Sequence, residues 1–171
     1  MTIAYWHEEY CTGNSLVDEQ HQNLFKIVNT LHDAMMQGKG KQILKQTLDE
    51  LIKYTIDHFT TEEKLMLQYS YPYYKDHKRK HDELTDKVSN LAEEFTEGNI
   101  LLNAEVLHFL NEWLIHHIKG EDLAMINFIR KKHDLPVSEY SQKDYHQNAL
   151  AKIEEAQALI EQLKKSLKSK S

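Results

Sequence analysis

The apolar residues of this chain fall into long stripes at the spacing of an α-helix, and little interrupts them. Among 171 residues there are only 5 Gly and 2 Pro, so the usual breaks between strands and turns are scarce. Short β-branched runs bounded by Gly, Pro and Asn are also missing. This combination predicts a chain built from long amphipathic helices that are joined by short loops.

Four successive segments carry such a stripe, and the residues around them mark their ends. The predicted helices cover about residues 15–36, 41–69, 73–97 and 101–119. Asn14 and Ser15 suit the N-cap of the first helix, while Pro72 and Gly98 break the chain after the second and third. Gly120 is expected to interrupt the fourth helix, with a short further helix following over residues 121–131. The predicted fold class is therefore all-α, an up-down-up-down four-helix bundle.

The last part of the chain predicts one more amphipathic helix. Residues 1–132 are expected to form the bundle, and residues 133–171 a linker and this additional C-terminal helix. Its apolar positions alternate spacings of three and four: Ile153, Ala156, Ile160, Leu163 and Leu167. The helix either packs on the bundle or makes a coiled-coil contact with a protein partner or a second copy of the chain. Two heptads are too few to decide between these.

Composition argues against several classes of partner. The formal net charge is -6, so no overall basic field exists to attract nucleic acid. No run of about 18 apolar residues predicts a membrane span, and the N-terminus has neither the basic nor the apolar region of a signal peptide. Cys11 is the only cysteine, so no intrachain disulfide can form. The expected location is the cytoplasm.

The unusual number is 11 histidines, and several of them lie on the apolar stripes. The polar residues on these stripes are His21, His58, Glu62, His77, His81 and His117. Two pairs, His58 with Glu62 and His77 with His81, have the i, i+4 spacing that places side chains on the same helix face. Every predicted helix therefore directs an imidazole or a carboxylate into the core.

Asp122 is a further candidate whose spacing is less favourable. It follows His117 by five residues, which in a regular α-helix would turn its side chain roughly 140° away from that histidine. Gly120 lies between the two and could relax the helix end enough to bring Asp122 back. On that basis Asp122 is included as a seventh candidate ligand.

Burying five imidazoles and two carboxylates without partners would cost several kcal/mol for each unsatisfied group. Metal ions remove that cost, because every imidazole nitrogen and carboxylate oxygen gains a partner. Seven ligands are too many for one tetrahedral zinc, and no thiolate is available, so two ions that share bridging carboxylates fit better. The donor set alone leaves iron, manganese and zinc open. A ferritin-like oxidase needs Glu-x-x-His on two helices, and only Glu105 with His108 matches.

Four separate segments share a motif order with one known family. The segments read VDEQH, HFTTEE, HKRKH and WLIHHIKGED, over residues 17–21, 58–63, 77–81 and 113–122. In order they supply H, HxxxE, HxxxH and HxxxxD. Over about residues 6–132, this pattern resembles the hemerythrin family, especially its bacterial members.

The resemblance implies a non-haem centre of two iron ions inside the bundle. One iron would be bound by His77, His81 and His117, and the other by His21 and His58, which leaves the second iron an open position. Glu62 and Asp122 would bridge the irons, together with a solvent-derived oxo or hydroxo group. The implied function is reversible binding of molecular oxygen for storage, delivery or sensing, and the chain would then not be an enzyme.

Two other functions stay open on the sequence. A di-iron enzyme acting on oxygen, peroxide or nitric oxide would turn over repeatedly with a reductant. An iron-storage protein would hold more than two irons in each chain. Four bulky side chains within a turn of the ligands, Phe25, Phe59, Met66 and Trp113, are expected to form an apolar wall or simply to pack the core. The other histidines, His116 included, are expected at the surface or around the site.

Overall fold

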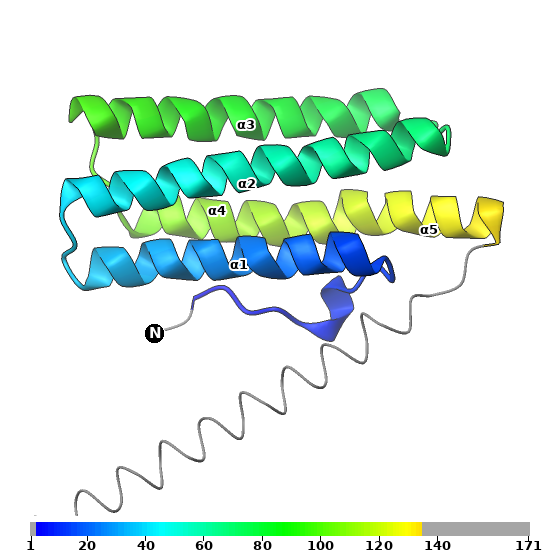
Figure 1. Cartoon of the computed structure of the whole chain (residues 1–171), viewed down its shortest axis with the longest axis horizontal. Coiled ribbons are helices and arrows are strands. Elements are labelled where there is room, and N and C mark those ends of the chain that lie inside the picture. Colours follow the sequence, from blue (N-terminus) through cyan, green and yellow to red (C-terminus); the bar gives the residue numbers. More distant parts are fainter. Residues whose placement is uncertain (1–2, 135–171) are drawn as a thin grey trace, which may run out of the picture.

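The structure is a computed structural model that describes residues 3–134. In that part the chain forms α1 (Ser15–Met36), α2 (Lys41–Gln68), α3 (Tyr74–Glu97), α4 (Ala104–His117), the π-helical turn η2 (Ile118–Asp122) and α5 (Leu123–His133). Figure 1 shows α1, α2 and α3 running beside one long rod made of α4, η2 and α5. The predicted all-α, up-down-up-down bundle is confirmed.

Two predictions concern the ends of the chain. The predicted C-terminal helix lies outside the described residues, so it and the domain boundary at residue 132 stay predictions. No helix within residues 3–134 combines the length and apolarity that a membrane crossing needs.

Local side-chain chemistry explains where the helices begin and end. The Asn14 side chain accepts a hydrogen bond from the Val17 N–H at 3.2 Å, which caps α1 as expected. Asn103 caps α4 in the same way, so this helix begins at Ala104 and not near residue 101. Gly98 ends α3 with φ 86°, a left-handed conformation that glycine adopts without strain.

The N-terminal arm comes before α1 in the chain and lies beside it (Figure 1), and it contains the short 3-10 helix η1 (Glu8–Tyr10). At its start, the N–H groups of residues 3 and 4 both donate to Asn29 Oδ1 at 3.0 Å. At its end, the Thr12 N–H and hydroxyl donate to the buried Asp18 carboxylate at 2.7 and 2.8 Å. These bonds hold the aromatic residues of the arm against the bundle, where Trp6 contacts Phe25 edge-on.

The apolar core has two separate clusters. The larger contains Leu24, Phe59, Leu84 and Ile118 among others. The smaller consists of Val17, Met66, Tyr71, Met125, Ile126 and Ile129. Burying each such side chain contributes roughly 1.5–3 kcal/mol. Along the chain, His21 lies between Val17 of the smaller cluster and Leu24 of the larger, Glu62 lies between Phe59 and Met66, and Asp122 lies between Ile118 and Met125.

Candidate metal centre

All seven candidate ligands are buried, and they come from every helix of the bundle. Each has a relative exposure of 5% or less. One lies on α1 (His21), two on α2 (His58 and Glu62), two on α3 (His77 and His81), one at the end of α4 (His117) and one in η2 (Asp122). The structure therefore brings together every residue that the sequence nominated.

Asp122 reaches this interior because the helix changes its winding. The Leu123 N–H donates to the carbonyl of Ile118, five residues earlier, which is the hydrogen bond of a π-helix. The wider turn accommodates one more residue than an α-helical turn, so Asp122 returns to the face of His117. The regular α-helix is interrupted around Gly120 and the short helix α5 follows, as expected, but the interruption is a π-helical turn and not a break in the helix.

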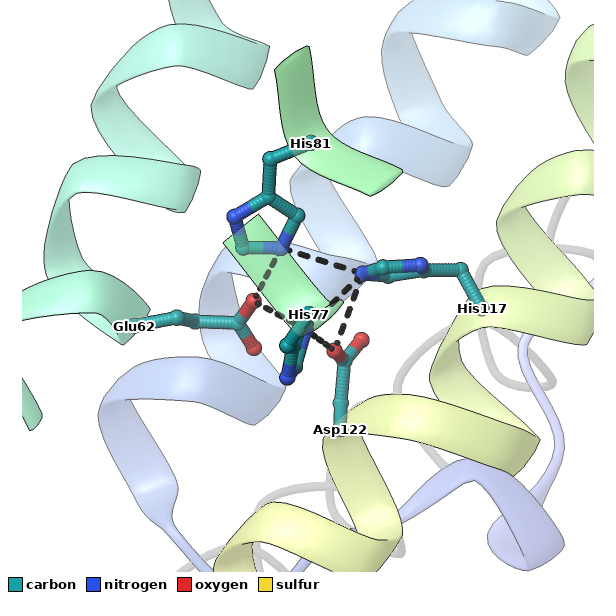
Figure 2. Close-up of side chains that lie close together, drawn as sticks. All are labelled: Glu62, His77, His81, His117 and Asp122. Carbon is teal, nitrogen blue, oxygen red and sulfur yellow. Dashed lines mark hydrogen bonds and ion pairs between the residues drawn. The ribbon is translucent and has the colours of Figure 1, made fainter. Parts of the chain in front are cut away.

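Five side chains form the first group of donors, and Figure 2 shows them pointing toward one another from α2, α3, α4 and η2. Asp122 Oδ1 lies 3.1 Å from His77 Nε2 and 3.2 Å from His117 Nε2. Glu62 Oε2 lies 3.2 Å from His81 Nε2. The nitrogens themselves are crowded, since His117 Nε2 is 3.1 Å from the Nε2 atoms of both His77 and His81.

The second group uses the same two carboxylates from the other side. His21 Nε2 lies 3.1 Å from Asp122 Oδ2 and 3.8 Å from Glu62 Oε1. His58 Nε2 lies 3.7 Å from Glu62 Oε2. One ligand atom from each member of a group lies within 4.8 Å of those of the others, so each group could hold a metal ion. Glu62 and Asp122 belong to both groups.

Two residues outside the groups orient the imidazoles. Glu63 Oε1 lies 3.3 Å from His81 Nδ1, and Gln20 Oε1 lies 3.2 Å from His58 Nδ1. Both partners are acceptors, so each Nδ1 carries the proton and each Nε2 directs a lone pair inward. Gln20 and Glu63 could not be found from the sequence, since they only neighbour ligands along the chain and no spacing rule marks them.

This arrangement has too many acceptors and too few donors to satisfy itself. Among the described residues, both oxygens of Glu62, both oxygens of Asp122 and Nε2 of His21 are buried without a hydrogen bond. Such groups cost about 1–3 kcal/mol each when left unsatisfied. A cation supplies what the lone pairs lack, so the residues present fit a metal site by their own chemistry.

Burial also controls the protonation of the imidazoles. It holds the pKa of His58 well below its usual range, and nearby His21 lowers that pKa further. Burial, reinforced by His117 and His77, lowers the pKa of His81 to about 2. Both rings are therefore neutral, which is the form of histidine that binds metals.

The two carboxyl groups respond to burial in opposite directions. Burial raises the pKa of Glu62 well above its usual range, and the charge of Asp122 raises it further. Burial also acts to raise the pKa of Asp122, but contacts with His117, His21 and His77 outweigh it and hold that pKa well below the usual range. Without a metal, Glu62 thus keeps its proton while Asp122 is charged.

Aromatic rings pack against the imidazoles. The Phe59 ring stacks on His81 with centroids 3.7 Å apart, and the Trp113 ring stacks on His117 at 4.3 Å. Phe25 belongs to the same large cluster, whereas Met66 packs in the small cluster. The arm adds Trp6, whose ring centroid lies 6.1 Å from that of His21 and which the sequence analysis did not nominate.

His116 is the histidine next to a candidate ligand that stays outside the site. Its side chain is 79% exposed and lies 3.5 Å from Glu112. His108 is exposed as well. Both therefore lie at the surface, as the sequence predicts for histidines turned away from the core.

A buried array of imidazoles and carboxylates between the helices of an antiparallel bundle defines a class of helical metal-binding proteins. The family model described as the hemerythrin HHE cation binding domain matches residues 12–129. The chain belongs to the hemerythrin family.

Named relatives agree with this assignment. The chain is 36% identical to a bacteriohemerythrin of Methylococcus capsulatus over 123 residues, covering 71% of this chain and 93% of the relative. It is 32% identical to a bacteriohemerythrin of Pseudomonas paraeruginosa over 130 residues, which are 76% of this chain and 84% of the relative. A crystal structure of wild-type hemerythrin superposes with a TM-score of 0.68 at 31% identity, covering 72% of this chain and 95% of that one.

Proposed function

We propose that the chain holds two iron ions between its helices and uses them to bind molecular oxygen reversibly. His77, His81 and His117 would bind one ion, His21 and His58 the other, and Glu62 and Asp122 would bridge them. Membership of the hemerythrin family and the names of its bacterial relatives support iron and oxygen as the metal and the ligand.

The observation that carries the proposal is the sharing of both carboxylates by two groups of unequal size. The first group has three histidines and the second has two. Two ions held in this way would have unequal numbers of protein ligands. The ion with two histidines would keep room for a small ligand.

The space beside the site suits a very small ligand. A cavity of about 30 Å³ borders His58 and His117, and its wall is otherwise formed mainly by apolar side chains such as Leu24 and Leu114. Sites for larger organic ligands occupy roughly 300–1,000 Å³. A space of this size favours a molecule of about two heavy atoms, which supports gas binding over the turnover of an organic substrate.

The residues of the chain hold, orient and shield the site. The iron pair, when bound, supplies the electrons that oxygen binding requires. Glu63 and Gln20 fix the imidazole rings, and Phe59 and Trp113 cover two of them. This covering excludes bulk water, which slows irreversible oxidation of such a centre.

Anaerobic reconstitution with ferrous iron tests the proposal. We expect two irons in each chain and a visible absorption band that appears with oxygen and fades under vacuum over repeated cycles. Immediate, lasting conversion to the ferric form would contradict reversible binding. Repeated consumption of oxygen, peroxide or nitric oxide with a reductant would instead identify an enzyme. More than two irons in each chain would identify a storage protein.

Adjacent histidines provide a matched pair of variants for that experiment. His117→Ala removes a buried member of the first group, whereas His116→Ala removes an exposed neighbour on the same helix. We expect His117→Ala to lose iron and the oxygen-dependent band, and His116→Ala to keep both. Equal behaviour of the two variants would show that the iron lies elsewhere.

A further inference from the structure

The cavity beside the site is almost entirely apolar. Leucines from four helices contribute to its wall, among them Leu24, Leu51, Leu84 and Leu110. Apart from His58, His117 and the indole ring of Trp113, the residue on this wall with a polar group is Thr55, three residues before His58 on α2. Thr55 is 8% exposed. Thr55 therefore lines the cavity together with one histidine of each group, His58 and His117.

Thr55 differs from most threonines in the helices. The hydroxyls of Thr30, Thr47, Thr61, Thr85 and Thr96 each donate to the carbonyl oxygen four residues earlier. In the described part of the chain no hydrogen bond involves the Thr55 hydroxyl, and that residue is buried. A hydroxyl that donates to no group of the protein is available to whatever occupies the cavity.

Water is a poor occupant of such a space. A buried water molecule usually makes two to four hydrogen bonds, and wholly apolar cavities stay dry. The Nδ1 atom of His58 is engaged by Gln20, and its Nε2 atom faces Glu62. Thr55 then supplies the one hydroxyl on a largely hydrocarbon wall. One hydrogen-bond donor is enough for a ligand with a single acceptor atom, but a buried water molecule needs more partners than this.

We propose that Thr55 is a specificity-determining residue of this cavity, which donates a hydrogen bond to a small ligand that carries an acceptor atom. The inference rests on the proposed function, since oxygen is the ligand that the site would take. Thr55 selects for such ligands over apolar atoms of similar size. It does so without contributing to the metal site itself.

Two variants of Thr55 separate hydrogen bonding from shape. Thr55→Val is nearly isosteric but has no hydroxyl, whereas Thr55→Ser keeps the hydroxyl and loses a methyl group. We expect Thr55→Val to weaken oxygen binding about tenfold, mainly through faster dissociation, while Thr55→Ser stays within about threefold of the wild type. Iron content is measured for all three proteins.

Xenon provides the second measurement, because it fills apolar cavities and accepts no hydrogen bond. Crystals of the three iron-containing proteins under xenon pressure should show xenon in the cavity of Thr55→Val at least as strongly as in the wild type. Oxygen affinity and xenon occupancy that fall together would overturn the proposal, because Thr55 would then only shape the cavity. Equal oxygen affinity in wild type and Thr55→Val would overturn it too.

The two proposals fail in different ways. Wild-type protein that contains iron but binds no oxygen reversibly would refute the proposed function, and the role of Thr55 would fall with it. Reversible binding that is indifferent to the Thr55 hydroxyl would refute only the role of Thr55.

Discussion

Glu62 and Asp122 belong to both groups of donors, yet the chain brings them there by different local structures. Glu62 follows His58 by four residues in the regular helix α2, so both side chains lie on one face. Asp122 follows His117 by five residues and reaches the site only through the π-helical turn η2. The difference shows that one helix face can be reached by a regular repeat or by a local change in winding.

Removing one residue from each helix tests this comparison, and the largest effect is expected in α2. Deleting the exposed Thr60 would shorten the spacing of His58 and Glu62 to three residues and rotate Glu62 and everything after it by roughly 100°. Met66 would turn away from its cluster as well. We expect loss of metal binding and a fall in the free energy of unfolding of several kcal/mol.

The matching deletion in η2 should do far less. Without Gly120, His117 and Asp122 would be four residues apart, the spacing that an ordinary α-helix brings to one face. We expect this variant to keep two metal ions, with affinity within about tenfold of the wild type, as measured by metal competition and elemental analysis. If both deletions abolished metal binding equally, the π-helical turn would not be the device that places Asp122.

These two carboxylates also show what the sequence could and could not predict. The i, i+4 pairs on α2 and α3 were readable because their spacing equals the helical repeat. Asp122 was included only on the expectation that Gly120 would relax the helix, whereas the structure reaches the same position by π-helical winding. Apolar periodicity cannot distinguish a helix that is relaxed at Gly120 from one that winds as a π-helix there, since a π-helical turn is a local exception to the pattern.

Residues that support the ligands were harder to find than the ligands. Gln20 and Glu63 act through an acceptor oxygen beside an imidazole Nδ1, and many partly exposed polar residues could do the same. Nothing in the sequence singles out Thr55, because a missing hydrogen bond is a property of packing and not of spacing. The four helices, by contrast, followed from local signals such as the Asn14 cap and Gly98.

The opposite pKa directions of the two carboxyl groups predict opposite effects on the metal-free protein. Glu62→Gln resembles the protonated form that burial favours, so we expect the metal-free protein at pH 7 to become slightly more stable. Asp122→Asn removes a charge that His117, His21 and His77 stabilise, so we expect a loss of roughly 1–3 kcal/mol. Chemical denaturation with chelator present measures both.

Metal affinity should respond to Glu62→Gln and Asp122→Asn in the same direction, unlike the stability of the metal-free protein. Both substitutions remove a shared carboxylate, so both should weaken metal binding even though their effects on metal-free stability differ in sign. A Glu62→Gln variant that is clearly destabilised without metal would contradict the proposed protonation of Glu62.

The lowered pKa values of His58 and His81 predict a loss of metal-free stability in acid. A histidine whose pKa is about 6.5 when unfolded, and about 2 in the folded protein for His81, takes up its proton only on unfolding between those values. Stability should therefore fall as pH drops below about 6.5, by up to about 1.4 kcal/mol per pH unit for each proton. Denaturation of metal-free protein from pH 7 to pH 5 measures this slope.

Glu62 opposes the histidines over part of this range, and a variant can separate the two. Its raised pKa contributes stability that is present below about 4.5 and lost as pH rises through the folded value. Glu62→Gln should therefore show a steeper acid loss than the wild type. If the stability of both metal-free proteins, the wild type and Glu62→Gln, stayed constant from pH 7 to pH 5, it would contradict the neutral, buried state of these imidazoles.

The smallest effect is expected at Gly120, and it bears on why η2 winds as it does. Gly120 has no positive φ, and a Cβ atom built on it would meet nothing within 4 Å. Its substitution by alanine should therefore leave the π-helical turn and the metal content unchanged. Because alanine loses less backbone entropy in a helix, we expect Gly120→Ala to gain roughly 0.5–1 kcal/mol in the free energy of unfolding. A loss of metal in Gly120→Ala would instead mean that the flexibility of glycine, and not the packing of α5 on the small cluster, holds Asp122 in place.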